Sequence, residues 1–204
     1  MENTKNSIED PTSAEAYVDR GNEFYNQGDY QAAISDYDEA IRLNPEDARV
    51  YGNRGNAKSK LEKHFEAISD YDQAIRIDPK YVRAYYNRGT AKIELGHPEA
   101  AITDYDEVIR LDPEYTDAYN NRGFAKSQIG KHFEAISDYD EAIRLDPEDA
   151  MVYNNRGTAK IRLEHPEAAI ADYDEAIRLN PEYTLARANR EDAQRKLRER
   201  EKET

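Results

Sequence analysis

The stretch YNNRGFAK, Tyr119–Lys126, decides the fold because close copies of it recur at a fixed interval. The other copies are YVDRGNEF from Tyr17, YGNRGNAK from Tyr51, YYNRGTAK from Tyr85 and YNNRGTAK from Tyr153, so that consecutive copies begin 34 residues apart. A second block, AISDYDEAIRLDP at Ala135–Pro147, recurs with the same period. A fixed period of this size indicates an array of stacked structural repeats.

Within one repeat the residues predict two packed helices. We number repeat positions so that Tyr17 and its equivalents stand at position 4; helix A then covers positions 1–14 and helix B about 17–31. In helix B, Ala135, Tyr139 and Ala142 are spaced i, i+4 and i+7, which places them on one helical face. Gly123 lies in the middle of helix A, where glycine costs about 1 kcal/mol relative to alanine. We therefore expect this glycine to let helix B approach closely.

These positions carry a resemblance to a known family. Tetratricopeptide repeats have a large aromatic residue at position 4, Gly or Ala at 8, Ala at 20, an aromatic residue at 24, Ala at 27 and Pro at 32. In the fourth repeat these positions are filled by Tyr119, Gly123, Ala135, Tyr139, Ala142 and Pro147. The chain resembles this family over about residues 14–183. The resemblance implies an all-α fold, a right-handed superhelical solenoid of antiparallel helix pairs.

The repeat register also predicts how the chain is divided. We expect a disordered N-terminal tail over residues 1–13 and a capping helix with a charged tail over residues 184–204. The five repeats are expected at residues 14–47, 48–81, 82–115, 116–149 and 150–183. The capping helix has one thin apolar stripe, formed by Leu185, Ala186, Ala188, Ala193 and Leu197. A capping helix shields the last repeat of an array from water; a coiled-coil seam is the weaker alternative, because too few heptads are present.

Composition excludes several classes of function. A formal net charge of −14 argues against a nucleic-acid binder, including an RNA-binding helical repeat, which needs a basic face. The absence of cysteine excludes disulfides and thiolate zinc sites. The N-terminus has no apolar run typical of a signal peptide, and no stretch approaches the length of a membrane span. We therefore expect a cytoplasmic protein that does not contact membranes.

The sequence predicts neither catalysis nor a cofactor. One histidine falls in each of four A–B turns, too far from the next for shared metal coordination; these are His64, His97, His132 and His165. No nucleophile–base pair and no glycine-rich phosphate loop is suggested by the motifs. We expect no metal site, no cofactor and no enzymatic activity.

The array departs from its family at two positions of helix A. Position 7, usually leucine, is arginine in every repeat, and position 11, usually tyrosine, is lysine in four of them. Position 23 of helix B is always aspartate. We predict that each such arginine, as Arg122, pairs with the aspartate at 23, as Asp138, within a repeat or between neighbours. The alternative is that the Arg and Lys rows bind an anionic ligand.

In this family helix A lines the concave groove, so its outward residues are the candidate site. Position 6 is asparagine in four consecutive repeats, and an amide can donate to and accept from a peptide backbone. The row is similar to the asparagine ladder in the tetratricopeptide superhelix of the O-linked N-acetylglucosamine transferase. Its members are Asn53, Asn87, Asn121 and Asn155. The other residues expected to line a peptide-binding groove are Asn22, Asn56, Asn120, Asn154, Arg49, Arg83, Tyr86 and Phe124.

Other roles for the same residues remain open at this point. The asparagines could only solvate the face or bond a neighbour in the next repeat. The carboxylate clamp of chaperone-binding members of the family is matched in type by Asn22, Asn53 and Arg83, but Val18 and Asn87 stand where it needs cations. We expect a non-catalytic scaffold that binds an extended peptide or a partner helix. The alternative is a self-associating or engineered repeat scaffold without a dedicated ligand.

Overall fold

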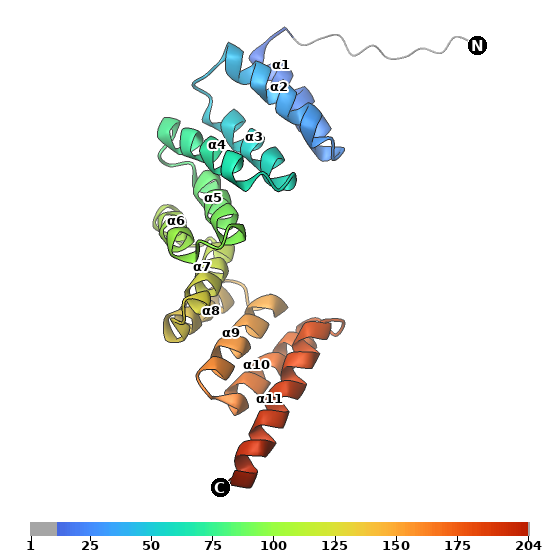
Figure 1. Cartoon of the computed structure of the whole chain (residues 1–204), viewed down its shortest axis with the longest axis vertical. Helices are drawn as coiled ribbons and strands as arrows, with labels where there is room; N and C mark the ends of the chain where they lie inside the picture. Colours follow the sequence, from blue (N-terminus) through green and yellow to red (C-terminus); the bar gives the residue numbers. More distant parts are fainter. Residues whose placement is uncertain (1–11, 204) are drawn as a thin grey trace, which may run out of the picture. The chain divides into compact units, whose positions relative to one another are not determined.

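The chain folds into α-helices throughout the part that the computed structural model describes, residues 12–203, with side chains described to residue 200 (Figure 1). The helices form two compact units, the first ending at Ala91 and the second beginning at Lys92. Within each unit, helices that follow one another in the chain pack as antiparallel pairs (Figure 1). The all-α fold of antiparallel helix pairs predicted from the sequence is thus confirmed.

The A and B helices alternate along the chain. The A helices are α1 (Ala14–Asn26), α3 (Ala48–Lys60), α5 (Val82–Glu94), α7 (Thr116–Gln128) and α9 (Ala150–Arg162). The B helices are α2 (Tyr30–Leu43), α4 (His64–Ile77), α6 (Pro98–Leu111), α8 (His132–Leu145) and α10 (Pro166–Leu179). A final helix, α11 (Thr184–Glu203), packs against α10.

A small residue on one helix and a tyrosine on the other set the closeness of each pair. Ala135, Tyr139 and Ala142 of α8 are buried with exposed fractions of 0–1%. A Cβ atom added to Gly123 of α7 would lie 2.8 Å from Tyr139 Cε1, closer than real Cβ contacts come. The expectation that this glycine serves close packing is therefore confirmed.

The two ends of the array differ in part from the expectation. The predicted tail, residues 1–13, falls almost wholly outside the described residues, but Ser13 accepts a hydrogen bond from the Ala16 backbone N–H and caps α1. In α11, Ala186 and Ala193 are buried, as a capping stripe requires. Leu185 of the same predicted stripe is instead 53% exposed, as is Met151 at the same position 2 of α9 with 49%.

Candidate functional site

The arginine at position 7 ties its helix to two others. Arg122 of α7 donates from Nε and Nη2 to the carboxylate of Asp138 on α8, at 3.0 and 2.6 Å. Its Nη1 donates to Asp106 of α6, in the preceding repeat, at 2.7 Å. Lys126, one turn along α7, contacts the same buried Asp138 at 2.7 Å. The guanidinium group also lies 5.5 Å from the centre of the Tyr119 ring.

The same pairing recurs along the array. The prediction that arginine 7 meets aspartate 23 is confirmed for Arg20–Asp36, Arg54–Asp70, Arg122–Asp138 and Arg156–Asp172. A second bond, from the arginine to the aspartate at position 25 of the preceding repeat, was not predicted. It is made by the pairs Arg54–Asp38, Arg88–Asp72, Arg122–Asp106 and Arg156–Asp140. These cations are engaged by the protein's own carboxylates, which disfavours the alternative of an anionic ligand on this face.

Burial and ion pairing shift the pKa of these arginines in opposite directions. Burial by itself would lower the pKa of Arg122. Hydrogen bonds and charge attraction from Asp138 and Asp106 outweigh it and raise the pKa of Arg122 above its ordinary value. The network therefore stays charged, and its role is to hold α6, α7 and α8 in register.

Asparagines at position 6 link α3 to α1, α5 to α3 and α9 to α7. In the first unit, Asn53 and Asn87 donate from Nδ2 to Oδ1 of Asn22 and Asn56, at 3.1 and 2.8 Å. In the second unit, Asn155 donates to Asn120 at 3.1 Å. Asn189 of α11 continues the row by donating to Asn154 at 2.9 Å. Asn189 was not among the predicted residues, although it stands 34 residues after Asn155 and the register could have found it.

Two of the predicted groove residues are not on the surface. Asn120 and Asn154, at position 5, are 4% and 3% exposed, because this position packs against the A helix of the following repeat. The expectation that they line an accessible groove is wrong. Their side-chain oxygens accept the bonds from Asn155 and Asn189 instead.

The remaining predicted residues are at least partly accessible. Asn22 and Asn56 are half-buried, and each also accepts a hydrogen bond from a core tyrosine hydroxyl. Arg49 is exposed and pairs with Asp47 at 2.7 Å and with Glu15 at 3.5 Å. Its side-chain hydrogen bond lowers the pKa of Asp47. Arg83 is exposed, Tyr86 and Asn121 are half-buried, and Phe124 is 41% exposed.

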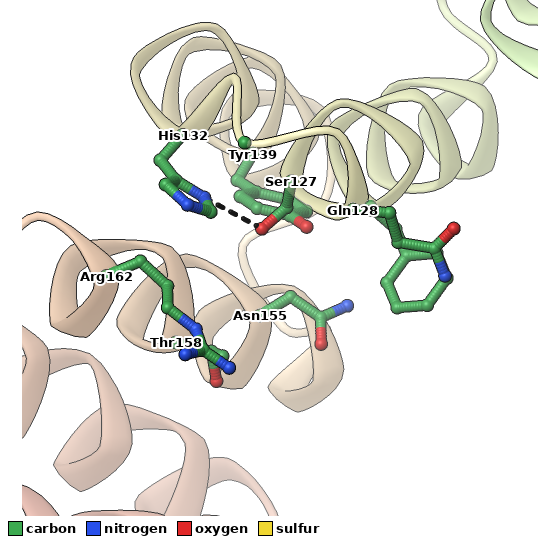
Figure 2. A pocket seen from close by; sticks show the side chains of 9 residues that line it. Ser127, Gln128, His132, Tyr139, Asn155, Thr158 and Arg162 are labelled. Atoms are coloured by element: carbon green, nitrogen blue, oxygen red, sulfur yellow. Dashed lines mark hydrogen bonds between the residues drawn. The ribbon is translucent and has the colours of Figure 1, made fainter. Parts of the chain in front are cut away.

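One cavity of about 420 Å³ lies beside Phe124 in the second unit. Figure 2 shows side chains of α9 facing those of the α7–α8 turn across it, and Ser127 Oγ lies 3.2 Å from His132 Nδ1. The lining residues are Phe124, Ser127, Gln128, Gly130, His132, Tyr139, Asn155, Thr158 and Arg162. Neither His132 nor Tyr139 was among the residues predicted to form a site. The signal in the sequence is position 9, which is Phe124 here and Asn or Thr in the other repeats.

Other kinds of site find no support in the described part of the chain. No group of His, Cys, Asp or Glu side chains between residues 12 and 200 is arranged to hold a metal ion. Among the helices that the structure describes, none is long and apolar enough to cross a membrane.

Comparison with known proteins assigns the repeats. A family model described as "TPR repeat" matches residues 21–62, 55–96, 89–130 and 126–163, and one described as "Tetratricopeptide repeat" matches residues 150–183. No curated protein matches the chain in sequence.

Solved structures of similar fold cover most of the chain. YrrB, a TPR protein with an unusual peptide-binding site, is 25% identical, with a TM-score of 0.76 over 88% of this chain and 92% of its own. A tetratricopeptide repeat protein from Parabacteroides merdae ATCC 43184 is 21% identical, with a TM-score of 0.81 over 90% of this chain and 73% of its own. MamA (41-end) from Desulfovibrio magneticus RS-1 is 19% identical, with a TM-score of 0.79 over 83% of this chain and 96% of its own. The last two show the fold alone.

Proposed function

Because the chain belongs to the tetratricopeptide-repeat family, we propose that it is a non-catalytic protein-interaction scaffold that binds an extended peptide along its A helices. Membership of the family supports the interaction scaffold. The peptide and its place on the A helices rest on the side chains of this chain.

The observation that carries the proposal is that the position-6 amides use only part of their hydrogen-bonding capacity within the protein. Asn53, Asn87 and Asn155 each donate one N–H to the preceding repeat. No residue of the described chain accepts from the second N–H of these three amides or donates to their carbonyls. Each half-buried amide thus keeps one donor and one acceptor, the pair that an extended backbone offers in return. The inter-repeat bond fixes the orientation of the amide before a ligand arrives, which reduces the entropy lost on binding.

Apolar residues on the same helices support the proposal. Phe124 of α7 and Met151 of α9 are 41% and 49% exposed. Exposed aromatic and methionine side chains are enriched where proteins bind partners. The peptide-binding site of YrrB is a property of that protein, and it makes peptide binding the first activity to test here.

The test compares peptide capture by the intact chain and by Asn121→Ala/Asn155→Ala. We expect the wild-type chain to retain peptides from a library of random decapeptides, and the double variant to retain several-fold less. Ser137→Ala on α8 is the matched control, because Ser137 is exposed and bonds only its own helix backbone. Thermal unfolding of each variant, followed by circular dichroism, shows that the repeats remain folded. Unchanged capture by the double variant would remove the asparagine row from the site.

A further inference from the structure

Tyr139 differs from the tyrosines at the same position of other repeats in what its hydroxyl meets. Tyr37 donates to Asn22 at 2.8 Å, Tyr71 donates to Asn56 at 2.9 Å, and the Tyr173 hydroxyl lies 3.3 Å from Thr158 Oγ1. In each case the partner stands at position 9 of the A helix.

In the fourth repeat position 9 is Phe124, which has no hydrogen-bonding group. Tyr139 is only 1% exposed, and no residue in the described range 12–200 makes a hydrogen bond to its hydroxyl. The residue lines the 420 Å³ cavity. Burial raises the pKa of Tyr139, so the hydroxyl keeps its proton and remains a donor at neutral pH. Tyr139 Oη is not among the described side-chain atoms that are both fully buried and unpaired, so the hydroxyl is accessible from the cavity and can donate to a ligand acceptor there.

The cavity is positive in a strongly negative chain. No aspartate or glutamate is among its lining residues, whereas Arg162 is. Arg162 is exposed, and no carboxylate within the described part of the chain pairs with it. A neighbouring hollow is lined by Arg162 together with Asp192 and Lys196, which pair with each other at 3.1 Å. The second N–H of Asn155 adds a further donor to the lining.

The second repeat shows that these features are not general to the array. It has the same KHFEAI turn, with Ser59 and His64 where the fourth repeat has Ser127 and His132. It has Asn56, however, at the position of Phe124, and Asn56 accepts from Tyr71. At the position of Arg162, the third repeat has Glu94. The second repeat has a cation, Lys60, at the position of Arg162, but it follows a first repeat whose position 9 is Asn22. The combination of an apolar position 9 with a cation at position 13 of the next repeat therefore occurs only at Phe124 and Arg162.

We propose that this cavity binds a carboxylate group of the peptide, with Arg162 pairing its charge, Tyr139 and Asn155 donating to its oxygens, and Phe124 packing on its aliphatic stem. The assignment rests on the proposed function, which supplies the peptide. A single guanidinium favours a carboxylate over a phosphate, because phosphate-binding motifs are recognised by arginine clusters. The carboxylate is either that of a Glu or Asp side chain or that of the peptide C-terminus.

The chain itself offers the variants that test this assignment. Phe124→Asn gives Tyr139 the acceptor that Tyr37 and Tyr71 already have, and removes the apolar wall. Arg162→Glu introduces the residue that the third repeat has at that position. Both residues occur at the same positions of other repeats, so both variants are expected to fold. Asn44→Ala, at an exposed position of the first unit, is the control.

The experiment presents random decapeptides to the intact chain and sequences those retained. One library is amidated at the C-terminus and the other is free, which separates the two sources of carboxylate. Affinities of selected peptides and of their Glu→Gln analogues are then measured by fluorescence polarisation. We expect acidic residues, or the free C-terminus, to be enriched, and the Gln or amide analogue to bind about 10- to 100-fold more weakly, as expected for losing a charge-assisted bond.

The variants decide the outcome. Arg162→Glu and Phe124→Asn should abolish the acidic preference, whereas Asn44→Ala should keep it. Peptides retained without an acidic preference, or a preference that survives Arg162→Glu, would overturn the carboxylate assignment and leave the proposed function standing. No retention of any peptide by the wild-type chain would overturn both. A dimer detected by sedimentation that Arg162→Glu dissociates would show that a second copy occupies the cavity, which would also overturn the assignment.

Discussion

Glycine at position 8 of the A helix illustrates how one residue sets the geometry of a helix pair. Gly123 costs α7 about 1 kcal/mol of helix propensity relative to alanine. In return it lets the Tyr139 ring lie directly on the α7 backbone. Tyr173 meets Gly157 in the same way in the following repeat. The preference of the isolated helix is thus overridden by the packing of the pair.

Replacing this glycine should destabilise the protein even though alanine is the better helix former. In Gly123→Ala the new Cβ would lie 2.8 Å from Tyr139 Cε1 and 3.1 Å from the backbone oxygen of Ala135, so the helices must separate. Overpacking of this kind costs about 1–3 kcal/mol, which exceeds the gain in propensity. Urea unfolding should show a lower midpoint than wild type. A higher midpoint would mean that propensity and not packing decides this position.

At the scale of the helix, the arginine at position 7 determines which elements are joined. Arg122 of α7 bonds one aspartate on its partner helix α8 and another on α6. Asp138 is 4% exposed and also pairs with Lys126. Breaking one partner of a buried pair is costly, whereas replacing both by apolar residues is often nearly neutral. The network therefore specifies the register of three helices more than it adds net stability.

A double-mutant cycle on this pair should show strong coupling. Arg122→Leu alone should cost about 3 kcal/mol, because Asp138 keeps only one of its two cationic partners. Arg122→Leu/Asp138→Leu should be less destabilised than the sum of the two single variants by at least about 1 kcal/mol. The exposed Arg144–Glu141 pair of α8 is the control and should show little coupling. Additive effects at Arg122 and Asp138 would contradict a buried, register-setting pair.

At the scale of the whole molecule, the buried tyrosines make stability depend on alkaline pH. One tyrosine per repeat is 1–2% exposed; these are Tyr37, Tyr71, Tyr105, Tyr139 and Tyr173. Burial raises the pKa of Tyr37 to about 12 and also raises the pKa of Tyr71, Tyr139 and Tyr173. In the unfolded chain the same phenols titrate near their ordinary value of about 10. Between these values the folded state holds protons that the unfolded state has lost.

We therefore expect the free energy of unfolding to be independent of these tyrosines below about pH 10 and to fall from there as pH rises towards 12. Each tyrosine that stays protonated only in the folded state lowers the free energy of unfolding by up to about 1.4 kcal/mol per pH unit in this range. Urea unfolding at several pH values between 8 and 11 measures this slope. Tyr139→Phe should make it shallower, since one titrating group is gone. Stability that stays constant or rises over pH 10–11 would refute the explanation.

The sequence by itself determined the fold and much of its packing. The period of 34, the small residues at positions 8, 20 and 27 and the tyrosine at 24 are local, repeated patterns, and each recurs in the structure as predicted. The pairing of arginine 7 with aspartate 23 was also predictable, because both lie near the helix A–helix B contact.

Only the tertiary structure decided which side of each A helix is accessible. Position 5 looked outward on a helical wheel, yet Asn120 and Asn154 are buried, because the next repeat covers them. The sequence left open whether the position-6 amides bond a neighbouring repeat, and Asn53, Asn87 and Asn155 are each fixed by a neighbour 31 or 35 residues away. The cavity at Tyr139 depends on Phe124, on Arg162 of the following repeat and on the α7–α8 turn meeting in space. Such properties belong to contacts between repeats, and a pattern read along one repeat does not contain them.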